Sequence, residues 1–244
     1  MDTRFWGPGA WKLLHTITYH SEAPLEDIRE FLSILPYVLP CKFCRASLTD
    51  YYEKEPLTFT NRRELQHWMY RVHNHVNGKL RKQGFVTIRN PTYDAVEKMY
   101  SGACAECSAF PAWDFLYSIA YNHPLKVKST PMPGAPAADV AANAAEANRW
   151  NILSPRARLT YWCKFWDILP RILPAEWKDA WVSATAGSPC ELEGRRDSVA
   201  WIWNIRCKFD TTRRDPYREV CSRLVSHSSG CSKSRRARTC RKKR

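Results

Sequence analysis

Glycine is scarce in this sequence, with 9 among 244 residues, whereas Trp and Tyr number 11 each. Sheet proteins with many tight turns use glycine more often, so this composition favours a helix-rich globular fold. The chain also lacks the run of about eighteen apolar residues that a membrane-spanning helix needs. Its first residues, MDTRFWGPGAWKLLH, lack the basic start and the cleavage site of a signal peptide. We therefore expect a protein without a membrane span that is not secreted.

Acidic residues are absent from the last twelve positions, KSRRARTCRKKR, which carry eight Lys and Arg. The formal net charge of the chain is +14, so about +6 remains for everything before these positions. Runs of like charge repel themselves and favour disorder, and we predict a basic, disordered tail at residues 227–244. Such a tail can make weak contact with nucleic acid, although a solvated terminus or a localisation signal explains it equally well.

Apolar residues recur at three- and four-residue spacing along the first hundred positions. This spacing predicts helices at 9–20, 25–38, 41–54 and 62–83 and a short fifth helix at 92–101. Asn61 with Glu64 three residues later has the capping-box pattern of a helix start. Because the connections are short, we predict an all-α fold: a small helical bundle of four helices plus a short fifth, followed by a second, mostly helical region.

Changes in composition divide the chain into predicted parts. Pro and Ala replace large apolar residues in VKSTPMPGAPAADVAANAAEA, which predicts a linker. Trp is frequent again beyond it, as in YWCKFWDILPRILPAEWKDAWV, which predicts another helical domain. The parts are a bundle domain at 1–103, a connecting segment with a CxxC pair at 104–126, the linker at 127–147, a helical C-terminal domain of unknown role at 148–226, and the tail at 227–244.

Cys41 and Cys44 form a CxxC pair directly after Pro40, in VLPCKFCRASL. Ten cysteines are unusual in a protein that is not secreted, and they point to redox chemistry or metal binding. Since Pro40 suits a helix start, the pair would lie in a first turn, where unpaired N–H groups and the helix dipole favour a thiolate. A zinc site needs two more ligands, and the next pair, Cys104 and Cys107, follows only after 59 residues. We therefore favour a redox pair over a zinc site.

Two predicted helices carry polar and aromatic side chains at four-residue spacing. Trp11, His15 and Tyr19 share one face of the first helix, and His73 and Asn77 share one face of the fourth. Core packing explains one such helix well. Two such faces inside one bundle need partners for their polar groups, and a flat heteroaromatic ligand with polar edges would supply them.

Three motifs now occur in a fixed order: FWGPGAWKLLH, PCKFC and HNHVNGKL. Together they resemble the Erv/ALR family of FAD-dependent sulfhydryl oxidases over residues 4 to 101, which is less than half of the chain. The segments APLEDIREFLSILPYVLPC and EKEPLT look more like the compact members encoded by large DNA viruses than like the cellular ones. The resemblance implies a small helical bundle that binds FAD.

The resemblance also implies roles for the residues that match its motifs. Cys41 would be the outer cysteine that exchanges with an incoming dithiol, and Cys44 would lie against the flavin. The residues that would bind FAD are Gly7, Trp11, His15, Tyr19, Cys44, His73, Asn74, Asn77, Lys79, Leu80, Lys82 and Tyr93. One disulfide of many cellular members is expected to be absent, because Tyr70 stands where their cysteine would precede His73.

The implied function is a flavin-linked thiol oxidase that makes disulfide bonds in proteins. Electrons would pass from a protein dithiol through the Cys41–Cys44 disulfide and FAD to oxygen, with formation of hydrogen peroxide. A second cysteine pair on a flexible arm would deliver them, and Cys104 with Cys107 is favoured for this shuttle over Cys231 with Cys240. The family implies a homodimer, and a viral origin implies the host cytoplasm or the virion, with the mitochondrial intermembrane space as the alternative.

Two other functions remain open at the level of sequence. A zinc-stabilised nucleic-acid-binding module would use the CxxC pairs as ligands and the basic tail as its working surface. A structural virion protein would use its cysteines as staples or leave them inert.

Overall fold

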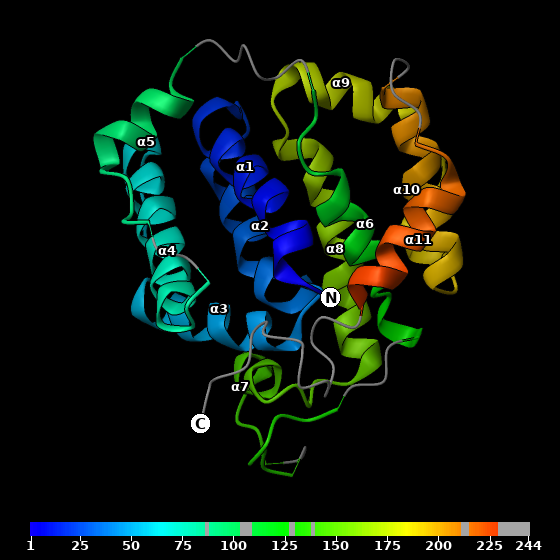
Figure 1. Ribbon diagram of the computed structural model, residues 1–244, viewed down its shortest axis with the longest axis horizontal. Coiled ribbons are helices and arrows are strands. Elements are labelled where there is room, and N and C mark those ends of the chain that lie inside the picture. Colours follow the sequence, from blue (N-terminus) through cyan, green and yellow to red (C-terminus); the bar gives the residue numbers. More distant parts are fainter. Residues whose placement is uncertain (86–87, 103–108, 127–129, 138–139, 211–214, 229–244) are drawn as a thin grey trace.

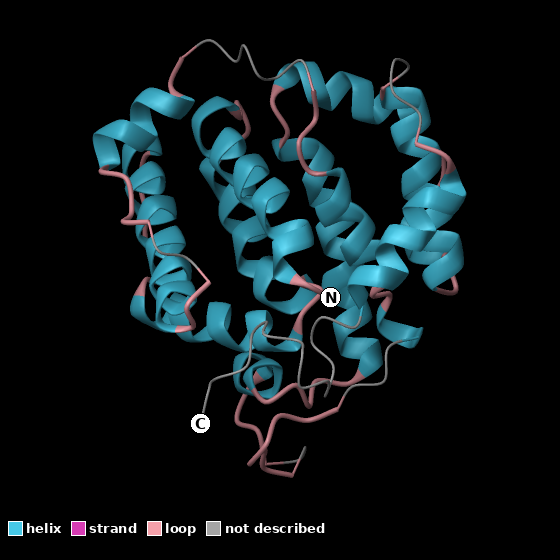
Figure 2. Cartoon of the chain, in the orientation of Figure 1, coloured by secondary structure: helices cyan, strands magenta, loops and turns pink. Residues whose placement is uncertain are grey.

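The computed structural model describes residues 1–85, 88–102, 109–126, 130–137, 140–210 and 215–228, and helices joined by loops make up these ranges (Figure 1, Figure 2). No strand occurs in them, so the predicted all-α fold class is confirmed. The predicted bundle helices form in the predicted order: α1 (Thr3–His20), α2 (Leu25–Val38), α3 (Lys42–Lys54), α4 (Arg62–Lys82) and the short α5 (Tyr93–Tyr100).

Side-chain caps set where these helices begin. Asn61 accepts a hydrogen bond from the backbone N–H of Glu64 at 3.0 Å, which confirms the predicted start of α4. The first helix begins six residues earlier than predicted, because Asp2 caps it by accepting from Arg4 N and Pro8 is tolerated within its early turns. This early start extends α1 along the cavity described below.

The rest of the described chain is also helical, as predicted. Its elements are α6 (Trp113–Tyr121), the 3-10 turn η1 (Pro124–Lys126), α7 (Ala144–Arg149), α8 (Pro155–Ile172), α9 (Ala175–Ala184), the 3-10 turn η2 (Pro189–Glu191), α10 (Arg195–Phe209) and α11 (Tyr217–Ser228). None of the helices in the described ranges has the length and low polarity that crossing a bilayer requires.

One hydrophobic core joins the bundle to the C-terminal helices, with α8 against α2 and α6 against α1 (Figure 1). The rings of Phe31 and Phe165 lie 5.3 Å apart, and those of Tyr37 and Tyr161 stack at 3.9 Å. A side chain at Gly9 of α1 would bring a Cβ within 2.6 Å of the backbone oxygen of Pro111, so glycine permits this close approach. The two halves therefore stabilise each other through buried apolar surface.

The helix α7 begins within the predicted linker and ends two residues beyond it. It lies beneath α3 in Figure 1 and packs against it. Nearby, Met132 N donates to Trp150 O at 2.9 Å, and Lys42 Nζ donates to Thr130 O at 3.0 Å. The described part of this segment is therefore held at the start of the third helix. The division of the chain into domains stays a prediction.

Candidate functional site

The CxxC pair occupies the beginning of α3. Cys41 is the N-cap residue, and its backbone oxygen accepts from the N–H groups of Cys44 and Arg45, both at 3.0 Å. Cys44 therefore lies in the first turn, as predicted from Pro40. The two side chains differ in surroundings: Cys41 is 1% exposed, whereas Cys44 is half-buried and lines a large cavity.

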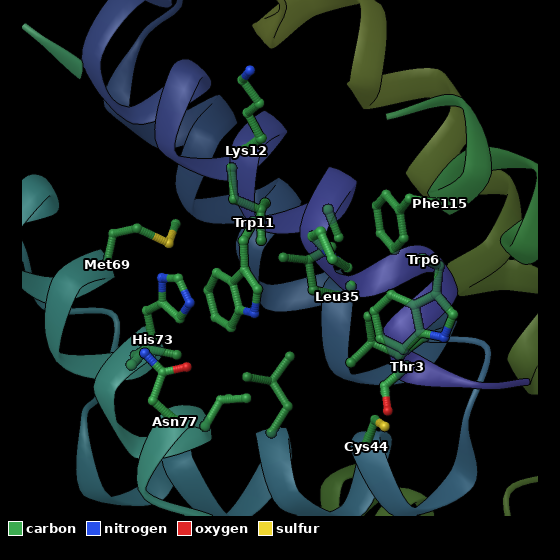
Figure 3. A pocket seen from close by; sticks show the side chains of 18 of the residues that line it. Thr3, Trp6, Trp11, Lys12, Leu35, Cys44, Met69, His73, Asn77 and Phe115 are labelled. Atoms are coloured by element: carbon green, nitrogen blue, oxygen red, sulfur yellow. The ribbon is translucent and has the colours of Figure 1, made fainter. Parts of the chain in front are cut away.

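This cavity has a volume of about 910 Å³ and lies among α1 to α5, with contributions from α6 and α9. Such a volume is at the upper end of the range for cofactor sites, about 300 to 1,000 Å³. Figure 3 shows Trp11 of α1 facing His73 and Asn77 of α4, with Cys44 rising from α3. The cavity thus brings the CxxC pair together with the two polar helix faces predicted from the sequence.

Stacked rings form one wall of the cavity. The rings of Trp11 and His73 lie 3.9 Å apart at an interplanar angle of 7°. Behind them, His15 Nε2 lies 2.9 Å from His73 Nδ1, and the ring of Tyr100 stacks on His15 at 4.8 Å. These contacts fix the orientation of the rings, so the wall is preorganised.

Burial determines the charge state of the two histidines. It lowers the pKa of His15 to about 3, and the nearby charge of His73 adds to this effect. Burial also lowers the pKa of His73 to about 4. Both rings are therefore neutral at pH 7, and one donates the shared hydrogen bond while the other accepts it.

Cations and no carboxylates line the cavity within the described ranges. Arg4, Lys12 and Lys79 are among its lining residues, and Asp and Glu are absent from them. Trp6 also lines it, and the indole N–H of Trp6 has no hydrogen-bond partner in the described chain. Stacked rings, an open N–H donor and positive charge fit a flat heteroaromatic group that carries phosphates, which is the composition of FAD.

The structure places seven of the predicted cofactor-binding residues along the cavity: Gly7, Trp11, Cys44, His73, Asn77, Lys79 and Leu80. The other five are not among the residues that line it: His15, Tyr19, Asn74, Lys82 and Tyr93. His15 supports His73 from behind, and Tyr19 stacks on Tyr100 at 5.9 Å. Tyr93 stacks on His67 at 3.8 Å. Their roles at the cofactor stay predictions.

Several aromatic residues of the cavity were not predicted as site residues, and three of them come from helices beyond α4. Tyr100 comes from α5, Phe115 from α6 and Trp177 from α9. Phe115 lies close to Trp6, with ring centroids 5.7 Å apart. Sequence spacing gave no signal for the last two, because only the packing of distant helices brings them to the bundle. The C-terminal region thus completes part of the cavity.

The predicted shuttle cysteines, Cys104 and Cys107, lie outside the described residues, as do Cys231 and Cys240. Within the described ranges, no group of three or more His, Cys, Asp or Glu side chains could hold a metal ion. The described geometry therefore gives the zinc hypothesis no support.

Comparison with known proteins gives a family match over residues 8–108, to the Erv1 / Alr family. A FAD-linked sulfhydryl oxidase of African swine fever virus (isolate Pig/Kenya/KEN-50/1950) is 37% identical over 83 residues, which cover 32% of this chain and 70% of the relative. The mitochondrial FAD-linked sulfhydryl oxidase ERV1 of Saccharomyces cerevisiae is 33% identical over 89 residues, 34% of this chain and 47% of the relative. No solved structure matches the chain.

The family match includes the CxxC pair and both histidines of the cavity wall, and it ends before α6. Viral and cellular relatives both align with this part, and the viral relative is covered over most of its length. The resemblance predicted from three short motifs is thereby confirmed, and the chain belongs to the Erv1/Alr family.

Proposed function

We propose that this protein is a FAD-dependent sulfhydryl oxidase that makes disulfide bonds in protein substrates. The observation that carries the proposal is the position of Cys44: it belongs to a CxxC pair and lines a cavity whose wall carries Trp11 and His73. Relatives named FAD-linked sulfhydryl oxidase align over this part of the chain. Neither the described geometry nor these relatives support a zinc module or a structural virion protein.

The residues of the cavity would hold the cofactor. Trp11 and His73 offer aromatic faces, Asn77 offers an amide, and Lys79 offers positive charge to phosphates. When bound, FAD supplies the chemistry that thiols lack, because it accepts two electrons and transfers them to oxygen, which becomes hydrogen peroxide. The protein contributes binding, orientation and the exclusion of water.

The cysteine pair would accept electrons by thiol–disulfide exchange. A substrate thiolate attacks the Cys41 sulfur, the Cys41–Cys44 bond breaks, and Cys44 leaves as a thiolate. The second substrate thiol, as thiolate, then attacks the substrate sulfur of the mixed disulfide and releases Cys41. The substrate has become a disulfide, two electrons remain on the pair, and two protons are released. Cys44 then holds reducing equivalents at the cavity wall.

The burial of Cys41 favours electron delivery through a shuttle cysteine pair. Because only 1% of Cys41 is exposed, a folded protein cannot approach it directly without displacing part of the chain. A small dithiol segment could reach it more easily, which supports the proposed shuttle role of Cys104 and Cys107. Homodimer formation, contact of the basic tail with nucleic acid, and the compartment in which the protein acts stay predictions.

Spectroscopy of the purified protein tests this function. We expect a yellow protein with a flavin absorption band that consumes oxygen and releases hydrogen peroxide when dithiothreitol is added. A colourless protein that holds one zinc ion per chain would contradict the proposal. Reduced, unfolded ribonuclease A as the substrate then tests disulfide formation in a protein, because its recovered activity reports native disulfides.

A further inference from the structure

Two buried asparagines lie at the C-terminal end of α7 and just after it, where this segment packs against the bundle. Asn148 is 0% exposed, and its Nδ2 donates to Pro36 O at 2.9 Å and to Thr49 Oγ1 at 3.1 Å. Asn151 is 2% exposed, and its Nδ2 donates to Thr130 O at 2.8 Å. Buried amide N–H groups need acceptors, and both Nδ2 groups find theirs on other segments of the chain, so this contact of the C-terminal region is specific.

Asn151 also joins two buried arginines. Its Oδ1 accepts from Arg45 Nη2 at 2.7 Å and from Arg158 Nη2 at 3.0 Å. Arg45 is 7% exposed and Arg158 is 6% exposed. Asn151 has a positive φ of 56°, which no other non-glycine residue in the described ranges has. Backbone in this region costs energy and persists where its surroundings hold it in place.

The arginine pair adjoins the CxxC turn. Arg45 follows Cys41 by one helical turn, and its Nη1 donates to Leu39 O at 2.7 Å, two residues before Cys41. The Arg45 guanidinium therefore ties the segment that precedes α3 to α3 itself. Burial, together with the charge of Arg45, lowers the pKa of Arg158 to about 9, so the Arg158 guanidinium remains charged at pH 7. Positive charge beside a cysteine stabilises its thiolate.

We propose that Arg158 and Asn151 are positioning residues for the Cys41–Cys44 pair. They hold Arg45 against the CxxC turn, and the buried positive charge of the two arginines stabilises the thiolate that exchange produces. Arg158 and Asn151 lie outside the family match at residues 8–108. The C-terminal region thereby acquires a role in tuning the redox pair. This inference rests on the proposed function only in taking Cys41 and Cys44 as that pair.

Equilibration with glutathione tests the proposal without FAD or oxygen turnover. The full-length protein is equilibrated in anaerobic glutathione buffers, and differential isotope alkylation with mass spectrometry reads Cys41 and Cys44 separately. In Arg158→Met the reduced pair loses a stabilising charge, so we expect the equilibrium to move about tenfold toward the disulfide. That change corresponds to a reduction potential about 30 mV more negative for a two-electron couple.

A second variant separates electrostatics from folding. Asn151→Asp keeps the size of the side chain and adds a carboxylate between two guanidiniums, at the loss of the bond to Thr130. We expect a melting temperature close to that of the wild type and an equilibrium shifted toward the disulfide by about threefold or more. Arg158→Lys keeps the positive charge at this position. We expect the glutathione equilibrium of this variant to remain within about twofold of that of the wild type.

Arg149→Met is the matched control. Arg149 belongs to the same segment and binds Asp50 and Glu53 on α3, away from the CxxC turn. We expect its glutathione equilibrium to match that of the wild type. Unchanged equilibria in both Arg158→Met and Asn151→Asp would overturn the proposal, and if Arg158→Met does not fold, Asn151→Asp alone decides. A colourless, inactive wild type would overturn the oxidase function while leaving this equilibrium test valid.

Discussion

The imidazoles of His15 and His73 share a hydrogen bond of 2.9 Å that joins the first helix of the bundle to the fourth. Trp11 stacks on the cavity side of this pair, and Tyr100 stacks on His15. At least one of the two rings must be neutral to accept this bond, because a doubly protonated pair would place two donors face to face. The wall of the cavity therefore depends on pH.

The stability of the flavin-free protein should fall in acid because of this pair. The folded-state pKa values, about 3 for His15 and about 4 for His73, lie below the ordinary value of 6.5. The unfolded chain therefore binds more protons as the pH falls from 6.5 to about 4, and the folded state becomes less stable over that window. We expect each histidine to contribute up to about 1.4 kcal/mol per pH unit to the free energy of unfolding, measured by urea titration.

Substitution of one histidine tests whether the His15–His73 pair causes the loss of stability in acid. His73→Gln should remove roughly half of the slope between pH 6.5 and 4. His67→Gln serves as the control, because His67 lies on the same helix but stacks on Tyr93, apart from the pair. A slope that is identical in the wild type and in His73→Gln would show that other groups cause the acid sensitivity.

Loss of the Trp11 ring should weaken flavin binding. Trp11 forms the aromatic wall together with His73, and Trp11→Ala removes both its contact area and its stacking. We expect the affinity for FAD to fall by about tenfold or more, which is about 1.4 kcal/mol, measured by titration of the flavin-free protein. Trp11→Phe should recover part of it.

Trp203→Ala is the control for this experiment. Trp203 lies on α10, where its indole N–H donates to Asp215 O at 3.0 Å, and it does not line the cavity. Equal FAD affinities for Trp11→Ala and Trp203→Ala would remove Trp11 from the cofactor site.

Local patterns predicted the bundle well. The helices α2 to α5 begin and end within two residues of the ranges predicted from apolar spacing, since each buries a continuous stripe. Cys44 was placed correctly in a first turn, with Cys41 one residue earlier as the N-cap, because Pro40 and the preceding apolar helix restrict where α3 can start. Such features depend on neighbours in the sequence.

Contacts between distant segments were not predictable in the same way. Arg45 and Asn151 meet across 106 positions, and no spacing rule links an arginine after a CxxC pair to an asparagine in a Pro- and Ala-rich stretch. Phe115 and Trp177 reach the cavity for a similar reason, since α6 and α9 approach the bundle only through the shared core. Tertiary packing decided these positions, and the motifs that identified the family cover none of the C-terminal residues.

The two cysteines of the pair should differ in a measurable way. Cys44→Ser should retain FAD and lose turnover with dithiothreitol by at least about a hundredfold, because Cys44 is the sulfur at the cavity wall. Cys41→Ser should also lose turnover, since the disulfide cannot form. Oxygen consumption and the flavin absorption band are measured together, so that loss of cofactor is distinguished from loss of chemistry.

Cys207→Ser is the matched control for the pair, because Cys207 lies half-buried on α10 and outside the cavity. We expect turnover close to that of the wild type. Oxygen consumption that survives in Cys44→Ser would remove Cys44 from the mechanism.

The shared core should make the bundle and the C-terminal helices unfold together. Phe165 is 0% exposed on α8 and contacts Phe31 on α2, with ring centroids 5.3 Å apart. Phe165→Ala leaves a cavity at this junction and should lower the free energy of unfolding by about 3 to 5 kcal/mol. Because the junction belongs to one core, we expect a single unfolding transition. In Phe165→Ala, both this transition and the release of bound flavin should occur at a lower urea concentration than in the wild type.

Val182→Ala supplies the baseline for this test, since Val182 is 62% exposed on α9 and its loss should change stability by less than about 0.5 kcal/mol. Circular dichroism reports all helices, whereas flavin fluorescence reports the cavity that holds the cofactor. Two independent domains would give a different result: Phe165→Ala would shift the circular dichroism transition of the C-terminal helices while flavin release stayed where it is in the wild type. Coincident shifts of both signals are expected if burial of α8 against α2 stabilises the cofactor site.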